Sequence, residues 1–306
     1  MENLINKNIL NEIDNADKIY NGVHNIRSNG KSISRVTSDN VEIISKENNS
    51  GLIVNVKNNV MGVTVHIPVI LTNEDFTDTV NNTINIGESS DVVLIAGCGV
   101  HNSGINKTVH DGVHEIKVHK GAKLKYIEKH YAEGTSVSKK IFNTKTYIEV
   151  YEDATLEIEL VQIKGVDSSE KYTNIILHDN AHLVITERIF TELYQEVTSN
   201  INIEMVGKNS SAQIVSRSVA KDNSKQIFYF NLDGKNKCSG HIECDSIIMN
   251  NAKVTSVPAL SASNEDAELI HEAAIGKIAS EQILKLMSLG LTEEEAQDTI
   301  LKGFLK

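Results

Sequence analysis

Apolar and polar residues alternate in short runs along most of this chain, and polar turns separate the runs. In six of these runs a turn residue is followed by Ala and then by an alternating segment. They lie at 121–126, 153–158, 180–185, 211–216, 251–256 and 266–271. A second alternating run precedes several turns, as at 147–151 and 174–178, so each unit offers two strands. Most successive Ala positions are roughly 27 to 40 residues apart, a spacing at which stacked repeat units share one core.

The alternation also predicts which side of each strand is buried. Because successive strand side chains point to opposite faces, the residues two and four positions after each Ala share one side. In the first three runs these residues are Leu124, Tyr126, Leu156, Ile158, Leu183 and Ile185. We predict that this side is the interior of a mainly β fold, a parallel β-helix or a closely related β-solenoid. The irregular spacing of the repeats keeps a β-sandwich as the alternative.

Helices are predicted on both flanks of the β region. Apolar residues recur with helical spacing over 4–19, and the segments 280–288 and 292–301 form a C-terminal pair joined at 289–291. Thr292 followed by Glu295 is a capping box, which marks a helix start. We therefore divide the chain into an N-terminal helix at 1–22, a β-helix core at 40–264, and a last strand with the helical pair at 265–306, together forming one elongated unit.

Composition narrows the classes of function. The net charge of -11 and pI of 5.5 argue against a nucleic-acid or anionic membrane partner, because both bind clustered Lys and Arg. No signal peptide and no run of about twenty apolar residues is present, so we expect a cytoplasmic protein with no membrane span. Three cysteines do not make a disulfide framework, and cytosolic thiols stay reduced. The motifs of nucleotide hydrolysis, serine hydrolases, zinc proteases and dinucleotide binding are missing from the sequence.

The last β unit carries candidate chemistry. The strand phase places His271 on the interior side and Glu272 on the other, and it places Cys244 inside as well. A buried imidazole needs a hydrogen-bond partner or a metal, and an outward carboxylate can face a partner chain or a cofactor. In the alternative interpretation, Cys244 is a small core residue, His271 is a satisfied polar residue and Glu272 is a solvated charge.

Several blocks in one order resemble a known family. They are the residues at 215–218, 243–246, 257–260, 271–278 and 303–305, and they resemble the core domain of the SufB/SufD family of iron–sulfur cluster assembly scaffolds. The resemblance is dense over the C-terminal third and looser over the repeats, and it implies a β-helix flanked by helices and no enzymatic activity of its own. Cys at 244 and Glu after His271 resemble SufB more than SufD. The length of the sequence and the block at 98–102 resemble the short archaeal, SmsB-type minimal forms.

The resemblance implies a cargo and its ligands. The cargo is a transient iron–sulfur cluster, predicted to be of the 4Fe–4S type, held by Cys244 and Glu272, with His271 and Cys238 as further candidates. One protomer supplies too few ligands, so a symmetric pair of protomers that each contribute Cys244 and Glu272 would complete four. Cys98, with His101, is the candidate sulfur acceptor or secondary metal site.

The resemblance also implies partners. A SufC-like ATPase would dock on the C-terminal helices in a B2C2-type complex built on a homodimer, and apo-proteins would accept the cluster. The candidate docking residues are Ile283, Leu284, Met287, Ile300 and Phe304. The protein itself is expected to bind no nucleotide, because it has no phosphate-binding loop.

Two rival functions come from other classes. A zinc-dependent enzyme would use the histidine-rich segment from Cys98 to His119 for hydrolysis or lyase chemistry and would bind zinc without visible absorption. However, Gly112 and the alternation after His114 indicate a loop entering a strand, so His110 and His114 do not share a helical face, and surface or turn histidines are favoured. A polysaccharide-binding β-helix would be secreted and would expose aromatic platforms, and this sequence has no Trp.

Overall fold

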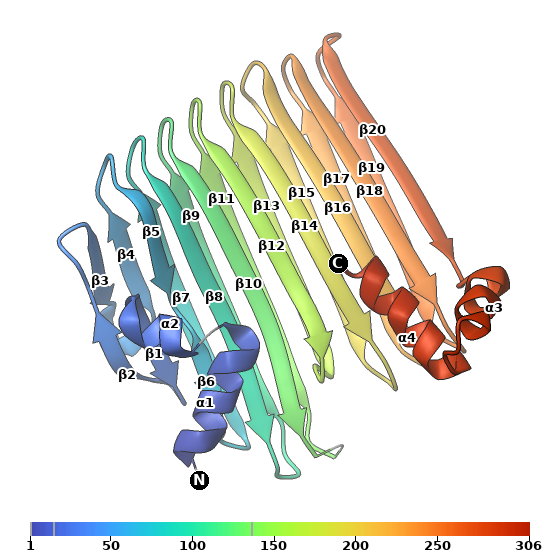
Figure 1. Cartoon of the computed structure of the whole chain (residues 1–306). Coiled ribbons are helices and arrows are strands. Elements are labelled where there is room, and N and C mark those ends of the chain that lie inside the picture. The colour runs from blue at the N-terminus through green and yellow to red at the C-terminus, as the bar shows by residue number, and fades with distance from the viewer. Residues whose placement is uncertain (1, 15, 136) are drawn as a thin grey trace.

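The computed structural model describes residues 2–14, 16–135 and 137–306, and it is a two-sheet β-solenoid with helices at both ends (Figure 1). Sheet A contains β1 (Val23–Ser28), β2 (Lys31–Val36), β5 (Met61–His66), β6 (Val69–Leu71), β8 (Asp91–Asn102), β10 (Lys123–Gly134), β12 (Thr155–Lys164), β14 (His182–Thr191), β16 (Ser210–Ala220), β18 (Cys238–Ile248) and β20 (Ala267–Gly276). Sheet B contains β3 (Val41–Ser45), β4 (Leu52–Val56), β7 (Phe76–Ile86), β9 (Thr108–Val118), β11 (Lys140–Val150), β13 (Ser168–Leu177), β15 (Glu196–Met205), β17 (Lys225–Gly234) and β19 (Lys253–Ala262).

From β7 onward, consecutive strands alternate between the two sheets. From β9 to β18, each strand pairs in parallel with the strand two before it and the strand two after it, as β12 does with β10 and β14. This pairing confirms the predicted parallel β-helix, because a β-sandwich has antiparallel sheets. Only the first strands differ, since β1–β2 and β3–β4 are antiparallel hairpins that begin the stack.

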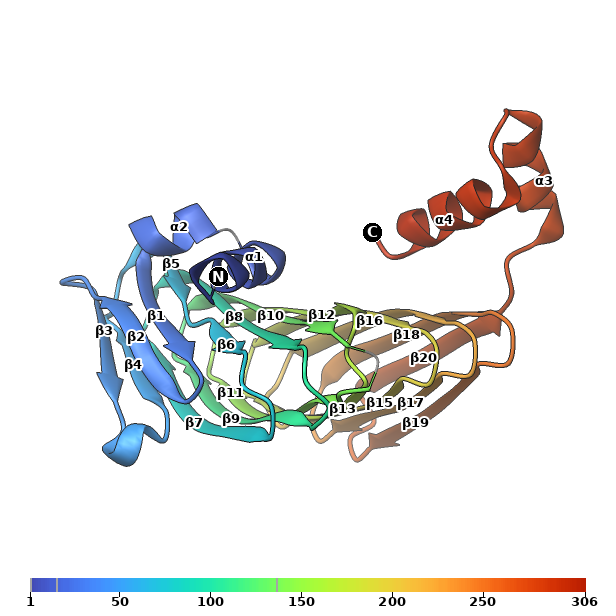
Figure 2. The same ribbon diagram turned by 90° about the horizontal axis from the view of Figure 1, so that it is seen from below.

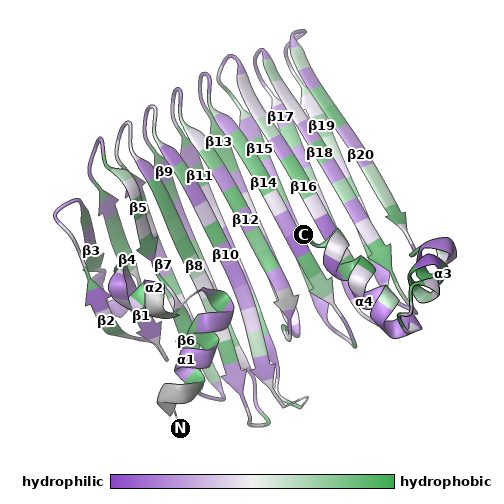
Figure 3. Cartoon of the chain, viewed as in Figure 1, coloured by the Kyte–Doolittle hydropathy of each residue, from purple (hydrophilic) through white to green (hydrophobic). Residues whose placement is uncertain are grey.

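The turn residues identified in the sequence make the tight corners. Asp153, Asn180 and Gly121 precede their Ala in the left-handed region, with φ of 58°, 54° and 66°. Asn, Asp and Gly adopt this conformation at the least cost, which explains why these residue types recur before each strand of the repeat. Figure 3 shows the alternation of hydrophobic and hydrophilic residues along the strands that follow.

The interior is divided lengthwise into an apolar and a polar half. The predicted interior residues are confirmed, since all six are at most 2% exposed: Leu124, Tyr126, Leu156, Ile158, Leu183 and Ile185. Further along the same strands, the inward positions become polar. In sheet A the paired strands there bring Glu128, Leu160, Glu187, Ser216 and Cys244 into one row.

The N-terminal segment forms two helices where one was predicted, α1 (Glu2–Ile13) and α2 (Ala16–Asn21). At the start of α2, the side-chain oxygen of Asn11 accepts a hydrogen bond from the Ala16 amide at 3.1 Å, which satisfies one of the amides that the first turn of a helix leaves unpaired. α1 lies on the outer face of sheet A, where Ile9 and Leu10 are fully buried (Figure 2).

The C-terminal helices are α3 (Ser280–Ser288) and α4 (Glu293–Phe304), and the short 3₁₀ turn η1 (Glu47–Asn49) lies between β3 and β4. The capping box is confirmed: the Thr292 hydroxyl accepts from the Glu295 amide, and Glu295 accepts from the Thr292 amide. α3 stands away from the solenoid and α4 turns back over sheet A (Figure 2). Within the described residues, no helix is long and apolar enough to cross a membrane.

Candidate functional site

Cys244 lies inside the solenoid near its C-terminal end. Its side chain is fully buried, and its direct neighbours in the sheet are Ser216 of β16 and Ala273 of β20. Burial raises the pKa of Cys244 to about 11, and the hydroxyl of Ser256 opposes the shift only in part. The sulfur is therefore a neutral thiol at neutral pH, and a metal must displace its proton to bind.

His271 faces the same interior. It lies directly beside Ile242, so its side chain points inward, as the strand phase predicts. Its ring nitrogen Nε2 is buried and has no hydrogen-bond partner among the residues that the structure describes. An unpartnered buried nitrogen is costly, and it lies on the same side of the sheet as the Cys244 sulfur.

Glu272 points the opposite way, to the outer face of sheet A. Its side chain is 63% exposed, and its Oε1 lies 2.8 Å from Nε2 of His241. On the adjacent strand it pairs directly with Glu243, while Cys244 pairs with Ala273. Within one protomer, Cys244 and Glu272 therefore lie on opposite faces of the sheet. The sequence analysis did not single out His241, whose place beside Glu272 depends on the pairing of β18 with β20.

Cys238 and Cys244 share a strand and a face, but they lie at opposite edges of the interior. Cys238 is 5% exposed and lies near Gly234 and Leu269 in the apolar half. Six residues of extended strand separate the two sulfurs by about 20 Å. The structure therefore does not bring Cys238 to the site of Cys244.

Cys98 lies far from Cys244, toward the other end of the solenoid. It points inward from β8 and pairs with His130 of β10, five strands or about 24 Å from β18. Burial raises the pKa of Cys98 well above its ordinary value, and the negative charges of Asp78 and Glu128 add to the shift. His101 points outward instead, with its ring nitrogens 2.8 Å from Glu133 and 2.7 Å from Ser103.

Between these two cysteines the interior holds buried charges that the sequence analysis missed. Glu128 accepts a hydrogen bond from the Tyr126 hydroxyl at 3.0 Å and lies 3.1 Å from the ring of His130. Burial alone would raise its pKa, but His130, Lys171 and His114 outweigh burial and hold the pKa of Glu128 below its ordinary range. The strand alternation could have predicted that Glu128 is buried, since it follows Tyr126 by two residues and so shares its inward face.

A second buried carboxylate lies closer to Cys244. Glu187 accepts hydrogen bonds from the hydroxyls of Ser199 at 2.6 Å and Ser216 at 2.9 Å. Gln162 and Lys171 have side-chain nitrogens without a partner among the described residues. Buried polar side chains therefore occur on the strands from that of Cys98 to that of Cys244, with Leu160 and Ile189 as apolar residues among them.

The residues of the proposed zinc site are dispersed. The prediction of surface or turn histidines is wrong for His110 and His114, which are buried and point inward from the unbroken strand β9. His101 points outward, and the ring of His119 stacks on Tyr151 at a turn, with 5.2 Å between ring centroids. Across the described part of the protein, no group of three or more His, Cys, Asp or Glu residues is placed to hold a metal ion. The structure therefore gives the zinc-enzyme alternative no support, and the described residues of one protomer form no complete metal centre.

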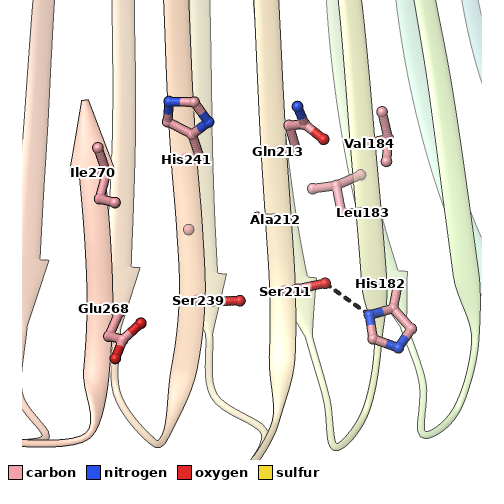
Figure 4. A pocket seen from close by; sticks show the side chains of 11 residues that line it. His182, Leu183, Val184, Ser211, Ala212, Gln213, Ser239, His241, Glu268 and Ile270 are labelled. Carbon is pink, nitrogen blue, oxygen red and sulfur yellow. Dashed lines mark hydrogen bonds between the residues drawn. The ribbon is translucent and has the colours of Figure 1, made fainter. Parts of the chain in front are cut away.

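A shallow groove of about 370 Å³ crosses the outer face of sheet A from β14 to β20 (Figure 4). His182 lies at one end, where its Nδ1 is 2.7 Å from the Ser211 hydroxyl, and His241 and Glu268 lie on the strands toward the other end. The polar groups do not converge on one point in the groove. The groove matters because it lies next to Glu272: His241, which lines the groove, contacts the Glu272 carboxylate.

The predicted docking residues lie on the C-terminal helices. α3, whose residues are all described, has no buried side chain, and Leu284 and Met287 are 62% and 39% exposed. Ile283, Ile300 and Phe304 are half-buried. These helices therefore present apolar side chains that the solenoid leaves largely uncovered.

Comparison with known proteins identifies the family. The family model described as "SUF system FeS cluster assembly, SufBD core domain" matches residues 69–304. Among curated relatives named as iron–sulfur cluster assembly SufBD family proteins, one from Methanothermobacter thermautotrophicus strain Winter is 32% identical over 236 residues, 76% of this chain and 56% of the relative. One from Methanocaldococcus jannaschii is 30% identical over 245 residues, 79% of this chain and 76% of the relative.

A more distant relative from Staphylococcus aureus strain USA300 is 29% identical over 242 residues, 74% of this chain and 50% of the relative. The chain thus spans little more than half the length of the two Methanothermobacter relatives, 56% and 55%. The match nevertheless extends over the solenoid from β6 onward and over both C-terminal helices. The chain therefore belongs to the SufBD family of the SUF iron–sulfur cluster assembly system.

Proposed function

We propose that this protein is a scaffold on which iron and sulfide are assembled into a cluster that is then transferred to apo-proteins. The observation that carries the proposal is the pair Cys244 and His271, a buried thiol and an unpartnered imidazole on one face at the end of the solenoid. Family membership supports the same role. In this proposal the protein catalyses no reaction of its own and acts in the cytoplasm.

The ligand chemistry suits a transient cargo. Iron in clusters binds thiolate first and accepts imidazole or carboxylate as more labile ligands. Because the pKa of Cys244 is raised to about 11, its proton competes with iron and weakens the bond at neutral pH. A scaffold that must release its cluster benefits from this competition. We propose a 4Fe–4S cluster, with Glu272 as the second ligand type.

A homodimer would complete the ligand set. β19 and β20 end the two sheets, and each has one edge without a paired strand among the described residues. Leu260 and Ile275 on these strands are 40% and 43% exposed. An open strand edge can pair with a strand of another protomer. A twofold arrangement of two protomers would bring together two copies of Cys244 and of Glu272.

The energy source in this proposal is a separate ATPase resembling SufC, bound to the homodimer in a B2C2-type complex. The exposed apolar side chains of α3 and α4 support docking at Leu284 and Met287, with Ile283, Ile300 and Phe304 alongside. Deleting the residues after Ile278 should abolish complex formation. Retained binding of the truncated protein to the ATPase would show that the docking surface lies elsewhere.

The function is tested by anaerobic reconstitution with ferrous iron and sulfide, followed by absorption spectroscopy and iron and sulfide analysis. Cys244→Ala should lose the charge-transfer absorption. Cys238→Ala is the matched control, because it removes the same residue type from the same strand and face about 20 Å away. Unchanged absorption and iron content in the Cys244→Ala variant would refute the proposed site.

Sulfur delivery is a secondary part of the proposal. Cys98 remains the candidate acceptor, with His101 as its candidate partner, although the two side chains point to opposite faces of β8. Its raised pKa keeps Cys98 a weak nucleophile in this conformation. Mass spectrometry after exposure to a persulfide donor should find the added sulfur on Cys98 in the wild-type protein, and labelling of Cys244 alone would exclude Cys98.

A further inference from the structure

The N-terminal hairpin carries a second group of polar side chains, seven strands or about 34 Å from β18. It consists of Ser34 on β2, His24 on β1 and the carbonyl group of Gly22, which precedes β1. These residues lie before residue 69, where the match to the family model begins. Any chemistry of this group is therefore separate from the proposed cluster site.

Hydrogen bonds fix the imidazole of His24 in one tautomer. Its Nδ1 lies 2.9 Å from the carbonyl oxygen of Gly22, and its Nε2 lies 2.8 Å from the hydroxyl oxygen of Ser34. Because a carbonyl oxygen can only accept, Nδ1 carries the proton. In the neutral ring Nε2 is then an acceptor, and the Ser34 hydroxyl donates to it. His24 is thus placed to take the proton of Ser34.

The surroundings hold this ring in place. His24 is 1% exposed, and its ring meets that of Tyr20 edge-on, with 6.2 Å between the centroids. Tyr20 belongs to α2, which lies over β1 (Figure 2). On the opposite side of β1, His24 pairs with His66 of β5. A hydroxyl bonded to a base that a third group orients is the arrangement that activates serine, and Ser34 is only half-buried.

Ser32, on the same strand, lacks such a base. Its hydroxyl donates to the side-chain oxygen of Asn25 at 2.6 Å. An amide oxygen is a much weaker base than an imidazole nitrogen, so this bond does not prepare the hydroxyl to lose its proton. β2 therefore holds one serine bonded to a base and a matched serine without one.

A groove of about 740 Å³ next to α2 indicates the class of substrate. Val36, Val63 and Ile95 contribute apolar side chains to its lining. Val36 lies directly across from His24, and it follows Ser34 by two residues on the same face of β2. An aliphatic chain joined to Ser34 can therefore extend into this groove.

We propose that Ser34 is a nucleophile that accepts an aliphatic acyl group from an activated ester or thioester. Its oxygen bonds to the acyl carbon, and the bond from that carbon to the leaving oxygen or sulfur breaks. The Ser34 proton passes to Nε2 of His24 and from there to the leaving group, so the imidazole returns to its neutral form. The product is an ester on Ser34, formed once per chain, and no electrons are gained or lost.

The test uses the full-length protein with p-nitrophenyl hexanoate as the acyl donor. The wild-type protein should release one equivalent of p-nitrophenolate in a burst, and peptide mass spectrometry should find the hexanoyl group on Ser34. Ser34→Ala should lose the burst, and the matched control Ser32→Ala should keep it. His24→Gln removes the base and should slow the burst at least about 100-fold.

Two further measurements separate the chemistry from folding defects. Mass spectrometry compares Ser34 with Ser32 inside one wild-type molecule, without any variant. p-Nitrophenyl acetate should react about tenfold more slowly than the hexanoate, because its chain is too short to fill the groove. Val36→Asp should remove this difference, since a charge disfavours the aliphatic chain there.

The proposal is overturned if the hexanoyl group is found mainly on Ser32 or on lysines, or if His24→Gln reacts at the wild-type rate. It is also overturned if acetate and hexanoate react equally fast with the wild-type protein. Cys244→Ala should give the wild-type burst. The assay contains no iron, so its outcome is distinct from that of cluster reconstitution at Cys244.

Discussion

The two ends of the solenoid are built in opposite ways. At the N-terminal end, two antiparallel hairpins begin the stack, and α1 lies on the adjacent outer face, where Asp14 at its end contacts His66 of β5. At the C-terminal end, β19 and β20 keep an open edge, and α3 stands away from the sheets. Because repeat proteins need caps at their ends to stay soluble, this difference supports the proposal that the homodimer forms at the C-terminal end.

We call the N-terminal end, where the hairpins and α1 cover the solenoid, the closed end, and the C-terminal end the open end. The largest loss of stability should come from a substitution at the closed end. A Cβ added at Gly99 would lie 2.0 Å from Cγ2 of Ile9, so α1 approaches β8 too closely for any side chain there. We expect Gly99→Ala to lower the free energy of unfolding by about 3 kcal/mol, measured by urea denaturation. Gly276→Ala is the matched change at the open end, where nothing lies within 4 Å, and it should be neutral. If both substitutions lowered the free energy of unfolding equally, the two ends would not differ in packing as we conclude.

Acid should also weaken the closed half, because its interior holds buried histidines. Burial lowers the pKa of His114 to about 4, with Glu128 opposing the shift. The unfolded protein takes up this proton near pH 6.5, so the free energy of unfolding falls by about 3 kcal/mol as the pH drops from 6.5 to 4. His114→Asn should flatten this part of the pH profile, measured by urea denaturation. An unchanged slope would show that His114 is protonated in the folded protein.

A smaller effect is expected on association at the open end. Leu260→Asp places a charge on a strand that the proposed dimer covers, and it should raise the dimer dissociation constant at least about tenfold, or 1.4 kcal/mol. Sedimentation equilibrium measures this change. Ile33→Asp is the control, since Ile33 is 55% exposed on β2 at the closed end and should leave association unchanged. If Ile33→Asp weakened the dimer and Leu260→Asp did not, the interface would lie at the N-terminal end and the prediction would be wrong.

The sequence allowed most of the fold to be predicted because the strand period is local. The inward positions of Tyr126 and His271 follow from counting residues within a single strand, and both are confirmed. Contacts between strands could not be obtained in this way. The pairing of Cys244 with Ala273, and of Glu272 with Glu243 and His241, depends on the lengths of the intervening turns. Those turns vary along the sequence, so the register of distant strands had to come from the structure.

The smallest loss of stability should be confined to α4, a helix that buries few side chains. In the capping box of α4, Thr292 accepts a hydrogen bond from the Glu295 amide, and removing such a cap costs about 1 kcal/mol. Thr292→Ala should therefore speed amide hydrogen exchange in the first turn of α4 about fivefold. Thr299→Ala, which removes only a bond to the Glu295 carbonyl within the helix, should not. The urea midpoint of the solenoid should stay unchanged in both variants, because α4 buries only Ala296 and Leu301. A lower midpoint for Thr292→Ala would mean that α4 supports the open end even without a partner.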